Sequence, residues 1–329
     1  VSLGRVDDFS HDGTVTTPPP RKRRSTPPGF HTFADVVTQF ADAADSLLHG
    51  ELSHPFLVGS EALGDQAARS DHEGTQSKQT LLTLATQQVA AGFEQTDLLL
   101  GVAAVLRADT VTLPPFPLAR TSAVIAAKAW YVLTADSREE RLRRFLNEEL
   151  AALYDLPLPS DEEEAVTFRN DRTADYLAVG ATAGLNPVYP KNRRPWDAPF
   201  LARTGQRKSE APPSETQLMK DLYRASGVHG DDLAGMPYKL LSAAAHGRFR
   251  QAGLVRHAPV GPSVGGVVTA AKYVPLEVTA QVTFYAALAT GTYLYALAQY
   301  TSVPESVVLE RLQQPFADWF AIAHPATTA

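Results

Sequence analysis

Apolar residues recur at intervals of three and four along most of this chain, the spacing that places them on one face of an α-helix. The pattern is clear over residues 31–48, where Phe33, Val36, Val37 and Phe40 open an apolar stripe. Alternating, strand-like patterns appear only in brief pieces such as residues 264–268. Further helical patterns cover residues 78–107, 118–134, 141–154, 215–226, 232–248, 276–301 and 305–322. The sequence therefore predicts an all-α fold, a multi-helix bundle of about seven or eight helices.

Local signals mark where several of these helices begin and end. Ser137 followed by Glu140 has the spacing of a capping box, and Ser214 stands before another helical stretch that Gly227 is expected to end. The proline cluster at residues 113–117 cannot continue a helix, so it separates two of them. The charges of the helix at 141–154 fall outside its apolar stripe, which predicts a face exposed to water.

Two segments lack helical periodicity. Residues 1–30 combine prolines with the basic run from Arg21 to Arg24, which indicates a disordered basic arm preceding a helical domain at 31–329. The run could attract nucleic acid or an anionic surface, or could simply be a solvated tail. Residues 155–212 hold an acidic run and several prolines, with at most a short helix near 174–184, and are expected to form a long irregular insertion.

Composition sets further limits. With 329 residues, 44% of them hydrophobic, the chain can build a large core, and its net charge of −6 argues against a globally basic nucleic-acid binder. The absence of cysteine excludes disulfides, thiolate nucleophiles and cysteine-based metal sites. Residues 1–30 contain no apolar signal region, so a cytoplasmic location is expected.

The stretch from 278 to 304 carries no charge and is long enough to cross a bilayer. Its threonines, glutamines and tyrosines disfavour insertion. We therefore expect a buried central helix here and no membrane partner.

The most informative polar feature is a stripe of Tyr238, Ser242 and His246, spaced four residues apart on an otherwise almost uncharged helix. A histidine with a free ring nitrogen is the usual general base near neutral pH, and Ser242 lies one turn away from it. The alternative is that all three are buried polar groups bonded to neighbouring helices. In either case we expect His246 to pack in or beside the bundle interior, with Arg120 within reach.

Opposite charges on two consecutive helices would lie side by side if these helices pack antiparallel. If the helices over 78–107 and 118–134 fold back on each other, Asp97 comes level with Lys128, and we expect these two to pair. Arg120 lies near the loop end, where it could instead hold an anionic ligand.

Motifs for metals and nucleotides are missing from the sequence. The nine histidines show no His-x-x-x-His pair, and neither a GxGxxG loop nor a Walker A sequence is present. We therefore expect no metal site and no cofactor.

Several short motifs follow one another in a characteristic order: Leu118-Ala-Arg120, Trp130-Tyr131-Val-Leu133, Arg141-Leu-Arg143-Arg144, Pro213-Ser-Glu-Thr216 and Tyr238-x-x-Leu241-Ser242-x-x-x-His246-Gly247. This order resembles a loosely defined group of uncharacterised helical proteins from high-GC Gram-positive bacteria, some of them HEPN-like in fold. The group's pattern has a glutamate where this chain has Val124. The resemblance implies an all-α bundle in which Arg120, Tyr238, Ser242 and His246 gather.

Two functions follow as hypotheses. The first is a non-enzymatic intracellular assembly or accessory module. The second is a HEPN-like RNA-processing or defence-associated ribonuclease that uses His246 with Arg120 or another nearby arginine. The partner, protein or RNA, and the oligomeric state stay open.

Overall fold

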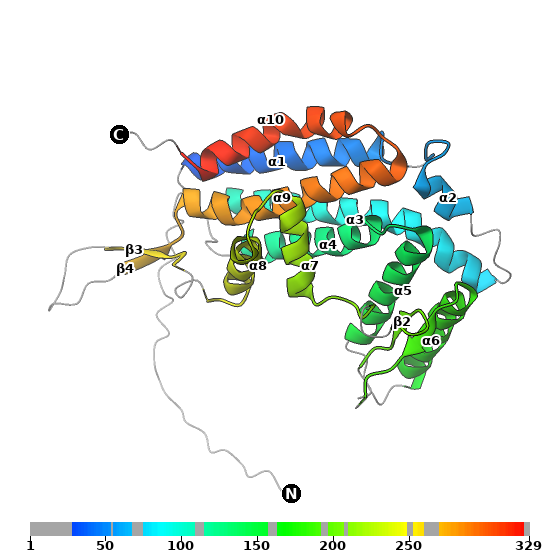
Figure 1. Cartoon of the computed structure of the whole chain (residues 1–329). Coiled ribbons are helices and arrows are strands. Elements are labelled where there is room, and N and C mark those ends of the chain that lie inside the picture. Colours follow the sequence, from blue (N-terminus) through cyan, green and yellow to red (C-terminus); the bar gives the residue numbers. More distant parts are fainter. Residues whose placement is uncertain are drawn as a thin grey trace, which may run out of the picture.

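The computed structural model describes residues 28–53, 55–67, 75–108, 115–156, 163–191, 197–206, 210–248, 253–259 and 270–325. Within these ranges the chain forms ten helices and two small antiparallel sheets of two strands each, so the predicted all-α class is confirmed (Figure 1). The helices are α1 (Pro28–His49), α2 (Glu61–Ala67), α3 (Thr75–Arg107), α4 (Pro115–Leu133), α5 (Arg138–Asp155), α6 (Glu163–Thr182), α7 (Glu215–Ala225), α8 (Asp231–Ala245), α9 (Leu276–Thr301) and α10 (Glu305–Ala323). The strands are β1 (Asn186–Val188), β2 (Phe200–Ala202), β3 (Arg256–Pro259) and β4 (Ala270–Tyr273), paired β1 with β2 and β3 with β4.

Helix α9 runs through the middle of the bundle. It packs against α4 on one side and α10 on the other, and it also contacts α1, α3, α7 and α8 (Figure 1). Small residues allow this close approach: a Cβ at Gly291 would come within 2.7 Å of the Phe316 ring of α10. The expected buried central helix is therefore confirmed.

Aromatic side chains hold α10 in contact with α1 and α9. The indole of Trp319 is fully buried, donates a hydrogen bond from Nε1 to the carbonyl oxygen of Ala280 at 3.2 Å, and meets Phe33 and Phe40 edge to face. Edge-to-face packing suits the charge distribution of aromatic rings, so this cluster stabilises the contact beyond its buried area.

The predicted helix ends are found where the local signals stand. Ser137 accepts a hydrogen bond from the backbone N–H of Glu140 at 3.2 Å, and Ser214 accepts one from Gln217 at 3.3 Å. Gly227 follows α7 with a φ of 87°, a conformation that favours glycine. Capping signals are local, which is why the sequence predicts them well.

The prolines of residues 113–117 partly belong to the helix that follows them. Helix α3 ends at Arg107, and α4 begins at Pro115. Proline lacks a backbone N–H, and the first turn of a helix leaves its N–H groups unpaired in any case, so proline is tolerated there.

The stretch expected to be irregular, residues 155–212, holds a longer helix than predicted. Helix α6 spans 20 residues, instead of a short piece near 174–184, and the β1–β2 hairpin follows it. Glu163 and Glu164 stand in its first turn, where negative charge stabilises the positive end of the helix dipole.

The boundary of the predicted arm needs a small correction. Helix α1 starts at Pro28, and Phe30 already packs against the core. Residues 1–27 lie outside the described residues, as does the strand-like piece at 264–268. The domain start at residue 31 is thus three residues late.

Among the described residues, one helical stretch is long and apolar enough to cross a membrane, judged by length and composition alone. It is Leu84–Arg107 of α3, rather than the uncharged α9. In the structure α3 packs against both α1 and α4.

Candidate functional site

The structure separates the residues of the predicted stripe. Tyr238 and Ser242 are half-buried on α8, whereas His246 is exposed at the C-cap of that helix. Helix α8 ends at Ala245, and Gly247 then adopts a φ of 70°, which turns the chain away. The expectation that His246 packs in or beside the interior is therefore wrong, because the helix ends one residue before it.

Arg120 and Tyr238 do come together, and Glu215 joins them. The guanidinium of Arg120 forms an ion pair with Glu215 and donates a hydrogen bond to the Tyr238 hydroxyl at 3.2 Å. That hydroxyl donates to Oε1 of Glu215 at 2.6 Å. The Arg120 guanidinium also lies 5.5 Å from the centroid of the Tyr238 ring, within the range of a cation–π interaction.

This three-residue contact ties α4, α7 and α8 to one another. Glu215 compensates the charge of Arg120, while the buried Nε of the same guanidinium has no hydrogen-bond partner among the described residues. Sequence reasoning missed Glu215 as a partner, although the cap at Ser214 already placed it in the first turn of α7. The missing information was which helix α7 packs against.

Lys128 pairs with a different carboxylate from the one expected. Its Nζ lies 3.2 Å from Oε2 of Glu148 on α5, whereas Asp97 is exposed on α3. The predicted Asp97–Lys128 pair is wrong because α5 runs beside α4 and supplies a nearer partner.

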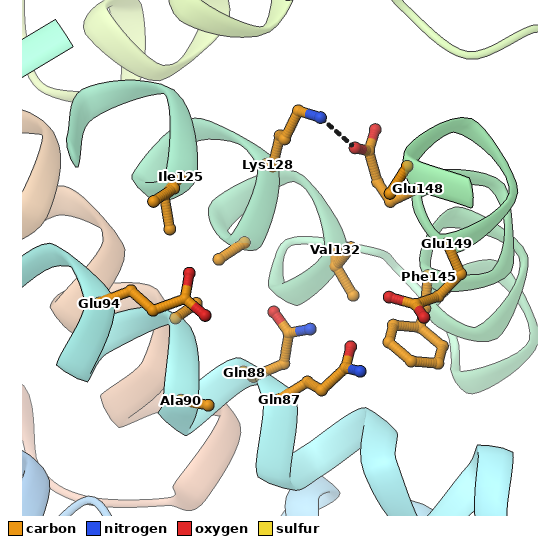
Figure 2. A pocket seen from close by; sticks show the side chains of 13 residues that line it. Gln87, Gln88, Ala90, Glu94, Ile125, Lys128, Val132, Phe145, Glu148 and Glu149 are labelled. Atoms are coloured by element: carbon orange, nitrogen blue, oxygen red, sulfur yellow. Dashed lines mark ion pairs between the residues drawn. The ribbon is translucent and has the colours of Figure 1, made fainter. Parts of the chain in front are cut away.

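The Lys128–Glu148 pair lies at a pocket of about 410 Å³ between α3, α4 and α5 (Figure 2). Each helix contributes four residues at the spacing i, i+3, i+4 and i+7, so the three walls are single helical faces. Four of the wall residues are alanines, whose small side chains leave the space between the helices unfilled. The walls are Gln87, Ala90, Ala91 and Glu94 from α3; Ile125, Lys128, Ala129 and Val132 from α4; and Phe145, Glu148, Glu149 and Ala152 from α5, with Gln88 beside the first set.

Acceptor groups predominate among the polar atoms of the pocket. Besides the paired Glu148, the carboxylates of Glu94 and Glu149 face it from opposite walls (Figure 2). Oε2 of Glu149 accepts a hydrogen bond from the Tyr176 hydroxyl at 2.7 Å. Burial together with this hydrogen bond raises the pKa of Tyr176 to about 12, so the hydroxyl remains a donor near neutral pH.

Gln88 is the residue of the pocket that the protein leaves unsatisfied. It is 4% exposed, and its side-chain oxygen Oε1 has no hydrogen-bond partner among the described residues. Figure 2 shows the side chain pointing into the pocket. Buried polar atoms are nearly always bonded, so an orphaned acceptor at a pocket wall indicates a place for a donor from outside the chain.

Two charged residues of α5, Arg141 and Arg143, are buried, contrary to the expectation of a solvated face. Arg141 is 2% exposed, and its Nε lies 2.7 Å from Oδ2 of Asp65, an oxygen that also accepts a hydrogen bond from Tyr300 at 2.9 Å. A second guanidinium nitrogen reaches Glu61 at 2.7 Å. These contacts fix α5 to its neighbours and lie outside the pocket lining.

A second charged cluster on the same helix centres on the half-buried Glu140. Arg143 and Arg144 donate hydrogen bonds to its carboxylate at 2.9 Å and 2.8 Å, and Arg203 donates another at 2.8 Å. Burial alone would raise the pKa of Glu140, but these hydrogen bonds and the positive charges of Arg143 and Arg144 lower it to about 2. The cluster therefore stays ionised over the whole neutral range.

The described ranges contain no group of three or more histidine, aspartate or glutamate side chains placed to hold a metal ion.

Comparisons with known proteins suggest no function, so a function has to be argued from the geometry of the site. No model of a protein family matches the chain, and neither the curated proteins nor the solved structures contain a match.

Proposed function

We propose that this chain is a non-enzymatic intracellular accessory module that acts by binding. The observation that carries the proposal is how the polar residues are used. Arg120 and Tyr238 are engaged with Glu215 in a contact between helices, and His246 lies apart at an exposed helix end. The acceptor of Gln88, unpaired among the described residues, and three carboxylates instead line a pocket.

A general base needs a group that orients it and a nearby site for the reacting atom. Arg120 would have to leave Glu215 to stabilise a phosphate, and this would leave a half-buried carboxylate without its ion-pair partner. The exposed position of His246 and the ion pair of Arg120 with Glu215 both weigh against the HEPN-like ribonuclease. A cytoplasmic location is part of the proposal.

The test is incubation of the full chain with labelled single-stranded RNA, beside the variants His246→Ala and Arg120→Gln. We expect no cleavage above the buffer background for any of the three. For His246→Ala we also expect an unchanged melting curve, because this side chain is exposed. RNA cleavage by the wild type that is lost in His246→Ala would overturn the proposal and favour the ribonuclease.

A further inference from the structure

We infer that the pocket between α3, α4 and α5 binds a small organic cation, a protonated amine on a short apolar body. The inference rests on the proposed function in that it names the ligand class of the binding module. It uses a different part of the molecule from the contact at Arg120.

The charges of the pocket favour a cation. Three carboxylates line it, from Glu94, Glu148 and Glu149, against the single ammonium of Lys128. Lys128 already pairs with Glu148 at 3.2 Å, so these two charges compensate each other. Two negative charges remain on opposite walls, and an anionic ligand would be repelled by both.

The orphaned oxygen of Gln88 adds a directed acceptor. An unbonded buried amide oxygen costs free energy, and a donor that reaches it recovers that cost. An ammonium group carries three N–H donors and no acceptor. It can therefore bond Gln88 and a carboxylate together, which a ligand carboxylate or phosphate cannot do.

The apolar residues of the pocket suit the hydrocarbon part of such a ligand. Ile125, Ala129, Val132 and Phe145 present apolar surface beside the acceptors. Pockets that take small molecules span roughly 300–1,000 Å³, combining an apolar lining with a few placed polar groups. The volume of about 410 Å³ suits a compact ligand with one amine end.

The experiment is isothermal titration calorimetry on the full chain near neutral pH with three matched probes: phenethylamine, phenethyl alcohol and 3-phenylpropanoate. They share one apolar body and differ in charge. We expect saturable binding of the amine, at least about tenfold weaker binding of the alcohol, and no binding of the acid. Equal binding of the amine and the alcohol, or no saturable binding of the amine, would overturn the inference.

Variants locate the site. Glu94→Gln is expected to weaken binding of the amine by about tenfold or more, whereas the exposed Glu310→Gln, which removes the same charge on α10, is expected to leave it unchanged. Gln88→Met should lose affinity without losing thermal stability, because it removes an acceptor that no protein group satisfies among the described residues. Ala152→Leu fills the pocket from its exposed edge and should block binding without disturbing the core. Equal effects of Glu94→Gln and Glu310→Gln would show general surface attraction and overturn the site.

The RNA assay on the same preparation separates the two proposals. If the amine does not bind and RNA is not cleaved, the ligand class is wrong and the accessory module stands. If RNA cleavage depends on His246 while the amine binds, the proposed function is wrong and the pocket assignment stands.

Discussion

The guanidinium of Arg141 is buried, and its charge is balanced inside the protein by Asp65 and Glu61. Without Arg141, the buried carboxylate of Asp65 keeps only the longer ion pair with Arg138 at 3.6 Å, so Arg141→Met should lower the free energy of unfolding by about 3 kcal/mol. The double variant Arg141→Met/Asp65→Asn should recover part of this loss, because both charges are gone. Urea denaturation measures all three proteins.

The control is Arg311→Met, since Arg311 reaches Glu51 at 3.6 Å while half-exposed. An exposed pair contributes at most about 1 kcal/mol, so this variant should unfold nearly as the wild type does. Equal losses for Arg141→Met and Arg311→Met would contradict the role of the buried pair.

Glu140 gives a prediction about pH. Its pKa is lowered from 4.5 to about 2 in the folded protein, so it binds its proton less readily there than in the unfolded chain. Its contribution to stability is therefore fully present above about pH 4.5 and is lost as the pH falls toward 2. Urea midpoints of the wild type and Glu140→Gln should differ most at pH 6, and the difference should shrink steadily as the pH falls from 4.5 toward 2. A constant gap across this range would contradict the assignment.

The buried arginines show what helical periodicity leaves out. The apolar stripe of α5 is buried as predicted, but so are Arg141 and Arg143 beside it. Asp65 is 76 residues away from Arg141 in the sequence, and the carbonyl of Glu210 that accepts from Arg143 is 67 residues away. A charge that faces another element looks the same in sequence as a charge that faces solvent.

At the scale of elements, the crossing of α9 and α10 depends on Gly291. A Cβ at this position would lie 2.7 and 2.9 Å from two atoms of the Phe316 ring, and that ring is held by edge-to-face contacts with Phe40 and Phe284. Gly291→Ala should therefore cost about 1–3 kcal/mol by overpacking, despite the better helix propensity of alanine. Thermal melting is a sufficient measurement.

Gly235 is the matched control, because it lies inside α8 and a Cβ added there would meet no described atom within 4 Å. Gly235→Ala should stabilise the protein by about 0.5–1 kcal/mol through helix propensity alone. If both variants shift the melting temperature in the same direction, close packing at Gly291 is not what keeps a glycine there.

Most helices of this chain are predictable because their signals are local. Caps, prolines and apolar stripes place α7 and α9 almost to the residue, whereas the weaker apolar pattern of α6 predicts only a short piece of that helix. The pocket is not predictable, since it needs three helical faces to meet. The pocket is lined by alanines and polar residues, where larger apolar side chains would fill the space. This pattern cannot be recognised from the sequence of any one helix.

Over the whole molecule, the helices differ in the fraction of their residues that is buried. Helix α9 buries sixteen of its 26 residues, whereas α6 buries four of its 20 and packs on α5 and α3, away from α9 and α10 (Figure 1). Segments with few buried contacts open locally at low free energy, and the most deeply packed ones exchange only on global unfolding. Amides of α6 should therefore exchange with deuterium far faster than those of α9, as mass spectrometry of proteolytic peptides would show.

Hydrogen–deuterium exchange on the variant Gly291→Ala tests whether α6 and α9 open independently of each other. That variant lowers global stability, so exchange in α9 should accelerate. Exchange in α6 should stay unchanged, because it proceeds through a local opening that does not involve the contact between α9 and α10. Equal protection of both helices, with equal acceleration in the variant, would show that the molecule unfolds as one cooperative unit from α1 to α10.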